Sequence, residues 1–121
     1  MPRPIHFEIP ADNPERAIAF YSAALDWRAE RFPDAEYWLV KTGAEGEPGI
    51  DGGISRRRDP EERPTNVMGV ASVAAAMQRI EAAGGRITVP RMAIPGVGWV
   101  AYALDTEGNP FGVFRADPEA A

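Results

Sequence analysis

Two side chains near the start of the chain, His6 and Glu8, are of the types that carry acid–base or ligand-binding chemistry. They alternate with apolar residues along residues 5–9, which is the two-residue period of a half-buried strand. Both side chains are therefore predicted to face the same side, with Cβ atoms about 7 Å apart. Because an imidazole titrates near neutral pH, His6 could serve as a general base or as a polar contact for a ligand.

Each candidate also has a purely structural interpretation. His6 could be a hydrogen-bonded or partly solvated residue of a cavity wall. Since an inward carboxylate without a partner is costly, Glu8 is expected to pair with His6, an arginine, water or a ligand. Asp51 could join them as a metal or ligand contact if Gly52-Gly53 formed a bulge that rotated its carboxylate inward; these glycines indicate either a bulge or a close backbone approach.

Three aromatic residues, Trp38, Trp99 and Tyr102, lie in predicted strands and could form a flat apolar wall for a planar ligand. They could equally belong to the core beneath the helices. Trp99 and Tyr102 have opposite parity, so both can face one side only if a bulge intervenes. Residues 95–98 fit either a mobile lip over this wall or a turn, and the turn is the preferred interpretation.

The elements that would position these residues repeat once along the chain. Each half predicts one strand, one helix and then three strands, with the charged segment 56–64 as a linker. The second half reads as a strand over 66–70, a helix over 73–83 and strands over 87–89, 99–104 and 111–115. Residues 90–98 are expected to be an irregular loop, and the tail from Ala116 to be frayed.

The predicted fold is therefore α+β. Two βαβββ modules, at about 3–56 and 64–116, are expected to form a curved, partly closed mixed sheet around a cavity, with the helices outside. A single domain over residues 1–121 is expected, because a chain of 121 residues is long enough for one modest core only.

Composition narrows the function classes. The formal charge of −5 argues against a general affinity for nucleic acid or anionic membranes, and the basic run 56–58 is followed by acidic residues that make it a solvated loop. The absence of cysteine excludes disulfides and thiolate chemistry. No apolar run of about 20 residues and no signal-like segment is present, so a cytoplasmic protein is the expectation.

Two stretches, HFEIPADNPERAIAFYSAALDW from His6 and IEAAGGRITVPRMAIPGVGWVAYALDTEGNPFGVF from Ile80, carry a family resemblance. The chain resembles the vicinal oxygen chelate superfamily, which contains glyoxalase I, bleomycin-resistance proteins and extradiol dioxygenases. The most specific signatures are the FY pair before the Leu-Asp-Trp turn and the late DTEGNPFGVF segment. The resemblance implies paired βαβββ modules, commonly assembled as homodimers, with the site inside the concave sheet.

The resemblance also implies where a catalytic metal would be held. Metal-dependent members place a ligand, mostly His or Glu, on the first and last strand of each module, because imidazole and carboxylate hold a divalent ion. His6 matches the first of these positions. Thr65, Gly52-Gly53 and Gly112 stand at or near the other three. With Asp51 or Glu8 as the only nearby acids, a family-type catalytic metal is not expected.

Three functions remain open from the sequence. The first is a protein that binds a small, partly aromatic or apolar molecule without a metal, as drug-sequestering resistance proteins do. The second is an enzyme: a metal-dependent lyase, isomerase or dioxygenase with His6 as one ligand, or a metal-free enzyme with His6 as the acid–base group. The third is a domain that only binds another protein. The sequence does not identify the ligand.

Overall fold

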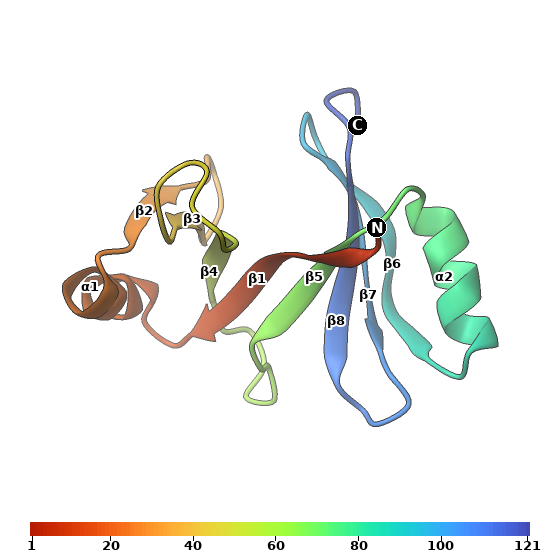
Figure 1. The fold of residues 1–121 in the computed structure, drawn as a ribbon. Coiled ribbons are helices and arrows are strands. Elements are labelled where there is room, and N and C mark those ends of the chain that lie inside the picture. Colours follow the sequence, from red (N-terminus) through yellow and green to blue (C-terminus); the bar gives the residue numbers. More distant parts are fainter. The chain divides into compact units, whose positions relative to one another are not determined.

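The computed structural model describes residues 1–121 and divides into two compact units. One unit is His6–Pro64, and the other combines Met1–Ile5 with Thr65–Ala121. The elements in chain order are β1 (Arg3–Ala11), α1 (Pro14–Leu25), β2 (Arg28–Arg31), β3 (Tyr37–Lys41), β4 (Gly52–Arg56), β5 (Thr65–Gly69), α2 (Val73–Ala82), β6 (Arg86–Ile94), β7 (Gly98–Leu104) and β8 (Pro110–Ala116) (Figure 1). This order is the predicted repeat of βαβββ.

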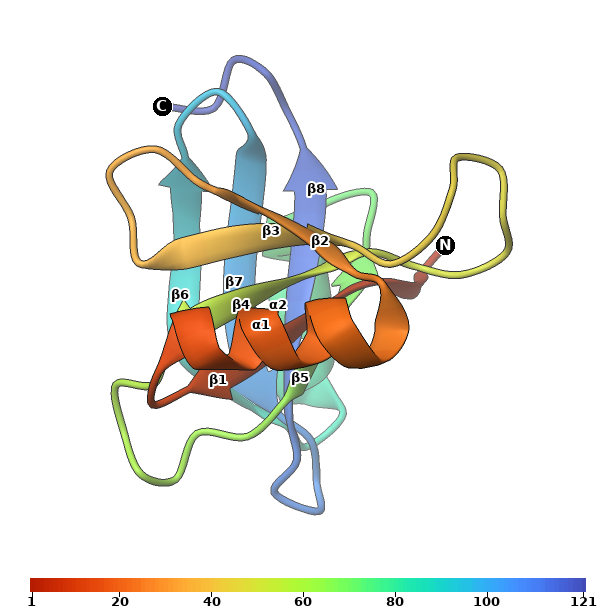
Figure 2. The same cartoon turned by 90° about the vertical axis from the view of Figure 1, so that its left-hand side faces the viewer.

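The unit His6–Pro64 has its strands in the order β2-β3-β4-β1. β3 pairs antiparallel with β2 and β4, whereas β1 pairs parallel with β4. Helix α1 begins after Asn13, whose side chain accepts a hydrogen bond from the backbone N–H of Arg16, and has Pro14 in its first turn. It ends at Asp26, which takes the left-handed conformation with φ 59°. Figure 2 shows α1 lying across the strands of this unit.

The core of this unit lies between α1 and the strands. Ala11, Val40 and Ile54 are buried there, and partly buried apolar residues, including Phe7 and Trp27, pack around them. The ring of Trp27 stacks on Tyr21 at 4.6 Å between centroids and meets Phe7 at 5.4 Å. Because Phe7, Ile9 and Ala11 alternate along β1 into this core, the intervening side chains of β1 point to the opposite face.

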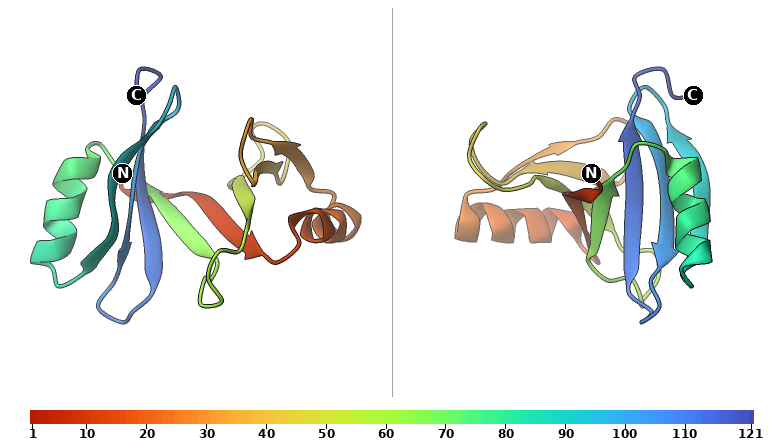
Figure 3. Two further views of the ribbon diagram at one scale, coloured as in Figure 1. Left: turned by 180° about the vertical axis from the view of Figure 1, so that it is seen from behind. Right: turned by 45° about the vertical axis from the view of Figure 1, so that its right-hand side comes forward.

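The second unit has the strand order β5-β8-β7-β6, with β5 parallel to β8 and the other pairs antiparallel. Helix α2 begins after Ser72, whose hydroxyl accepts from the backbone N–H of Ala75. Both views of Figure 3 show α2 against one face of β6, β7 and β8. Val73 of the helix is buried there with Ala101 and Val113 of the strands.

The predicted loop over 90–98 is wrong in its first part, because β6 continues through Pro90 to Ile94. The pairing of β6 with β7 shifts register between Ile87 and Val89 and again between Val89 and Met92. These irregularities and the position of β6 at the end of the strand order accommodate a proline that has no N–H to donate. The segment that follows forms a turn, which is the preferred interpretation of residues 95–98. The N–H of Val97 donates to the carbonyl of Ile94, and Gly96 has φ +74°.

The expectation of a frayed tail is also wrong. The N–H of Asp117 donates to the carbonyl of Val97, and the N–H of Gly96 donates to the carbonyl of Ala120. Ala120 is only 3% exposed. The tail is therefore tied to the β6–β7 turn by hydrogen bonds in both directions.

The α+β fold with two βαβββ modules in a mixed sheet is confirmed, since the two units together contribute eight strands and two helices. Neither helix has the length and continuous apolar character that crossing a membrane requires. The curvature, the enclosed cavity and the single-domain boundary remain predictions. One detail of the boundary is structural: Ile5 lies with the second unit, where a Cβ placed on Gly69 would be 3.2 Å from its side chain.

Candidate functional site

The face of the first unit opposite α1 carries a hydrogen-bonded group of three side chains. The Nε2 atom of His6 lies 2.6 Å from the hydroxyl of Tyr37. The same hydroxyl donates to Oε2 of Glu8 at 3.2 Å. All three side chains are half-buried. His6 and Glu8 therefore face the same side of β1, as expected, and one phenol contacts both of them.

Strand pairing brings Tyr37 to this position. In the register of the sheet, Glu8 of β1 and Leu39 of β3 both pair with Gly53 of β4. Tyr37 lies two residues before Leu39 on the same side of β3, so its ring must cross β4 to reach β1. A Cβ on Gly53 would overlap this phenol. The absence of a side chain at Gly53 is therefore what lets Tyr37 reach His6 and Glu8.

The glycine pair Gly52-Gly53 has two predicted interpretations, a bulge or a close backbone approach. A Cβ on Gly52 would overlap the ring of Phe7 on the α1 side, as one on Gly53 would overlap Tyr37 on the other side. The pairing of β4 with β1 and β3 is regular across both glycines. The alternative of a bulge is not found, and what approaches the two glycines closely is a pair of aromatic side chains.

Apolar surface borders the group. The ring of Phe32 meets Tyr37 edge-on, with centroids 6.5 Å apart and planes at 90°. Leu39, on the same side of β3, is 42% exposed. Two hollows of this unit lie away from the face: one of about 570 Å³ lies in the loop of residues 41–49, and one of about 480 Å³ lies beside Phe20 and Arg57. The chemistry of the face rests on its side chains.

Burial is the main influence on His6 and lowers the pKa of its imidazole below the ordinary value. The carboxylates of Glu8 and Asp51 act in the opposite direction and raise it, but they do not cancel the effect of burial. A lowered pKa leaves the ring neutral at pH 7. A neutral imidazole has one nitrogen that donates and one that accepts.

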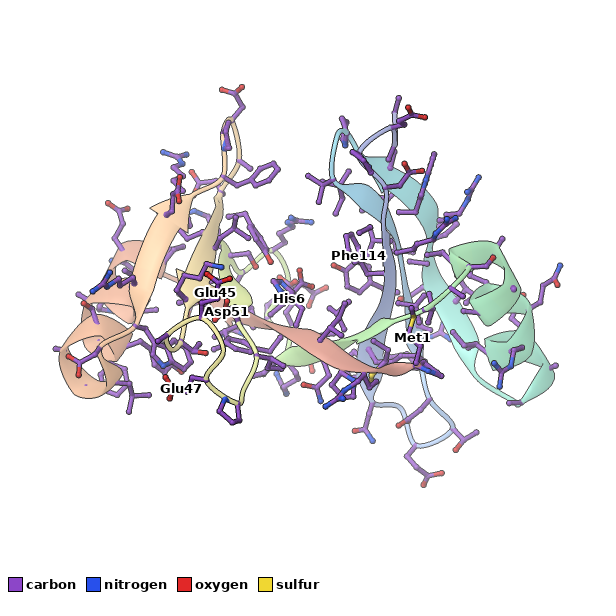
Figure 4. All side chains as sticks on the ribbon, turned by 45° about the horizontal axis from the view of Figure 1, so that its top comes forward. Met1, His6, Glu45, Glu47, Asp51 and Phe114 are labelled. Carbon is purple, nitrogen blue, oxygen red and sulfur yellow. The ribbon has the colours of Figure 1, made fainter.

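Asp51 is held by its own loop. Its carboxylate accepts hydrogen bonds from the backbone N–H of Thr42 at 2.9 Å and from Lys41 Nζ at 3.2 Å. The Thr42 bond is the first cause of the lowered pKa of Asp51. Figure 4 shows Asp51 next to the loop that carries Glu45 and Glu47. Because Gly52-Gly53 forms no bulge, nothing rotates the Asp51 carboxylate inward to contact a metal or ligand.

The residues at the implied metal positions do not fit a family-type divalent site. The chain contains no group of three His, Cys, Asp or Glu side chains that could hold a metal ion. Neighbouring side chains occupy the space next to Gly112. A Cβ at this position would lie 3.0 Å from the ring of Tyr102 and 3.3 Å from the side chain of Val67. Two remaining candidates, His6 and Glu8, both bind the Tyr37 hydroxyl.

The two tryptophans lie on helix-covered faces. Trp38 pairs with Ile54 and shares the side of Val40, and the guanidinium of Arg31 lies 5.2 Å from its ring. Trp99 packs against the core beneath α2. The packing of Trp99 agrees with the core interpretation. Ligand contact by either tryptophan remains a prediction.

Two polar residues also contact the indole of Trp99. Its Nε1 donates to Asp117 at 3.0 Å, and the guanidinium of Arg91 lies 4.3 Å from its ring. Tyr102 has the opposite parity, and its ring covers Gly112 on the other face of this unit. Its place in a ligand wall remains a prediction.

Tyr37 is the residue that sequence reasoning missed. The sequence predicts the strand that contains it, but from that strand only Trp38 is among the candidate residues. Two features of the sequence together could have identified it. A tyrosine lies on one strand, and the next strand contains a glycine pair that leaves space on both of its faces.

A family model described as Glyoxalase/Bleomycin resistance protein/Dioxygenase superfamily matches residues 3–113. No curated protein sequence matches the chain. Among solved structures, a methylmalonyl-CoA epimerase of Streptomyces coelicolor is similar with a TM-score of 0.70 and 15% identity, covering 100% of this chain and 99% of that one. A superfamily member from Vibrio splendidus 12B01 has a TM-score of 0.70 and 12% identity, covering 95% and 99%.

The methylmalonyl-CoA epimerase of Mycobacterium tuberculosis is also similar, with a TM-score of 0.65 and 16% identity over 95% of this chain and 88% of that one. At such identities the likeness concerns the fold.

Proposed function

Because the chain belongs to the glyoxalase/bleomycin resistance protein/dioxygenase superfamily, we propose that it binds a small organic molecule without a family-type catalytic metal. The ligand would lie against the face that carries His6, Glu8 and Tyr37. The observation that carries this proposal is the Tyr37 hydroxyl, which contacts the side chains of both His6 and Glu8 on β1. Phe32 and Leu39 beside it offer apolar contact to a partly aromatic ligand.

The metal-free part of the proposal follows from the donor chemistry. A divalent ion needs several deprotonated N or O ligands directed at one point. Here Nε2 of His6 is engaged by a phenol, Asp51 is engaged by Thr42 and Lys41, and the other implied positions carry no carboxylate or imidazole. A metal-dependent lyase, isomerase or dioxygenase that uses His6 as one ligand is the alternative.

A second candidate function is metal-free acid–base catalysis by His6. The lowered pKa keeps its imidazole neutral near pH 7, as a general base requires. The solved relatives named as epimerases act on or bind CoA esters according to their titles, such as 2-nitronate-propionyl-CoA. Their low identity to this chain does not support carrying that substrate over.

Two coarser features belong to the same proposal. A homodimer is proposed from the family resemblance, and light scattering on the purified protein would measure it directly. A cytoplasmic location is proposed from the sequence. Neither nucleic acid nor membrane is a proposed partner, because the chain carries a net charge of −5.

The test begins with the metal content of chelator-washed and metal-reloaded protein, beside a His6→Ala variant. The proposal expects no stoichiometric metal in either protein. Stoichiometric Ni, Zn, Mn or Fe that disappears in His6→Ala would establish the metal-dependent alternative instead.

A small-molecule thermal-shift screen then tests ligand binding at the face. Compounds that stabilise the wild type are expected to lose their effect in His6→Ala and to keep it in Glu81→Gln, a matched surface change on α2. Stabilising compounds that act equally on all three proteins would place the binding site elsewhere.

A further inference from the structure

The hydroxyl of Tyr37 has a single proton, and it contacts both Nε2 of His6 and Oε2 of Glu8. A carboxylate only accepts, so the contact with Oε2 of Glu8 requires the phenol to donate. The proton of Tyr37 is then used, and its oxygen can only accept from His6. The contact at 2.6 Å therefore requires a proton on Nε2 of the imidazole.

The reverse arrangement is unfavourable. If Tyr37 donated to an unprotonated Nε2, its oxygen and the carboxylate oxygen of Glu8 would face each other at 3.2 Å without a proton between them. Only the arrangement His6 Nε2–H to Tyr37, and Tyr37 O–H to Glu8, satisfies both contacts. The hydrogen-bond pattern thus assigns the Nε2–H tautomer to His6.

The other ring nitrogen, Nδ1, is left as the acceptor. The only hydrogen bond of the His6 side chain is the one to Tyr37. No buried side-chain nitrogen or oxygen of this chain lacks a partner, so the unbonded Nδ1 must be reachable from outside. A partner-free acceptor on a half-buried, neutral ring is available to an incoming donor.

We propose that His6 Nδ1 accepts a hydrogen bond from the O–H of a neutral phenol or enol, and that this contact selects such ligands over carboxylates. The proposal deepens the proposed function and rests on it. An anionic ligand would bring its charge to a ring that already lies in the negative field of the carboxylates of Glu8 and Asp51. It would also meet a lone pair at Nδ1 instead of a proton.

The rest of the face fits the body of such a ligand. Phe32 meets Tyr37 edge-on, and Leu39 is exposed on the same side of β3. A planar ring placed on these residues could direct one hydroxyl to Nδ1. Sites built around a hydrogen bond to a ligand hydroxyl reject the analogue that lacks it, because the protein group then loses its partner.

His6 is the only histidine of the chain, so histidine ring signals come from this residue and only its two ring nitrogens have to be told apart. In protein labelled with ¹⁵N-histidine, we expect at pH 7.5 one signal typical of a protonated nitrogen, assigned to Nε2, and one typical of an unprotonated nitrogen, assigned to Nδ1. In Tyr37→Phe this preference should weaken towards a mixture of tautomers. A protonated Nδ1 in the wild type would overturn the proposal.

Three probes then test the ligand class by titration at the same pH: phenol, its methyl ether anisole, and benzoate. Phenol is expected to shift the Nδ1 signal, with weaker or no effect from anisole and benzoate. An equal response to anisole, a stronger response to benzoate, or no response to phenol would each overturn the proposal.

The outcome separates this inference from the proposed function. If phenol fails but the thermal-shift screen still yields compounds that depend on His6, then the face binds ligands by another chemistry and only the ligand class is wrong. If the screen also yields none, the proposed function itself fails.

Discussion

Gly53 lies directly beneath the phenol of Tyr37, so that a β-carbon at this position would overlap the ring. The missing side chain on β4 lets an aromatic residue of β3 cross to β1 and bind His6 and Glu8. A position where metal-dependent relatives are expected to carry a ligand is thus occupied by the ring of a neighbouring strand. This relationship makes the arrangement testable by single substitutions.

Gly53→Ala should displace Tyr37 and break its two hydrogen bonds. Inserting a methyl group into a filled space costs about 1–3 kcal/mol, and urea unfolding would measure the loss in the free energy of unfolding. Ser55→Ala, on the same strand, is the control and should have a much smaller effect. Unchanged stability of Gly53→Ala, together with an unchanged His6 ¹⁵N spectrum, would contradict this account.

Tyr37→Phe removes only the hydroxyl that joins His6 and Glu8. We expect a loss of about 1.5–3 kcal/mol, the range for a hydrogen bond whose partner is a charged group. Tyr21→Phe is a matched control, because Tyr21 stacks on Trp27 and its hydroxyl makes no hydrogen bond. Equal stability of the two variants, measured by urea unfolding, would mean that the Tyr37 hydroxyl contributes little.

Stability should depend on the protonation of His6. Its folded-state pKa lies below the ordinary 6.5, so between the two values the unfolded chain binds the proton more readily than the folded one. The free energy of unfolding should therefore fall as the pH is lowered from about 6.5 through the folded pKa, and then level off. Tyr37 binds the ring, and the carboxylates of Glu8 and Asp51 act on it electrostatically.

The measurement is urea unfolding of wild type and His6→Gln across this range, since the variant has no titrating group at position 6. The difference between the proteins should change in the stated direction. Asp51 also has a lowered pKa, but its contribution is lost as the pH falls through the range around and below 3.8, well under 6.5, which separates the two effects. A slope of the opposite sign would show that the pKa of His6 is raised.

The tail should depend on the bond from Trp99 to Asp117. Asp117→Ala removes the acceptor of the indole N–H and of the backbone N–H of Glu119. We expect faster hydrogen exchange of the Gly96 N–H, which donates to Ala120. Glu119→Ala keeps both acceptors and should leave this exchange rate unchanged. Equal protection of Gly96 in all three proteins would show that the tail docks without this bond.

Local sequence patterns were enough to predict the helices and strands and the common orientation of His6 and Glu8. Alternation along β1 placed His6 and Glu8 on one face, because a strand's side chains alternate whatever lies around it. The helices also follow from local interactions: the side chains of Asn13 and Ser72 cap them by accepting hydrogen bonds from N–H groups of the first turn. The repeated element order identified the βαβββ modules.

Only the tertiary structure decided what these residues contact. Tyr37 is 31 residues from His6 and reaches it through the pairing of β3, β4 and β1, a register that no local period encodes. Pro90 remained in a strand because its neighbours shifted register, and Ala120 was buried by contacts with a distant turn. Sequence periodicity determines which way a side chain points, whereas long-range pairing determines what it meets.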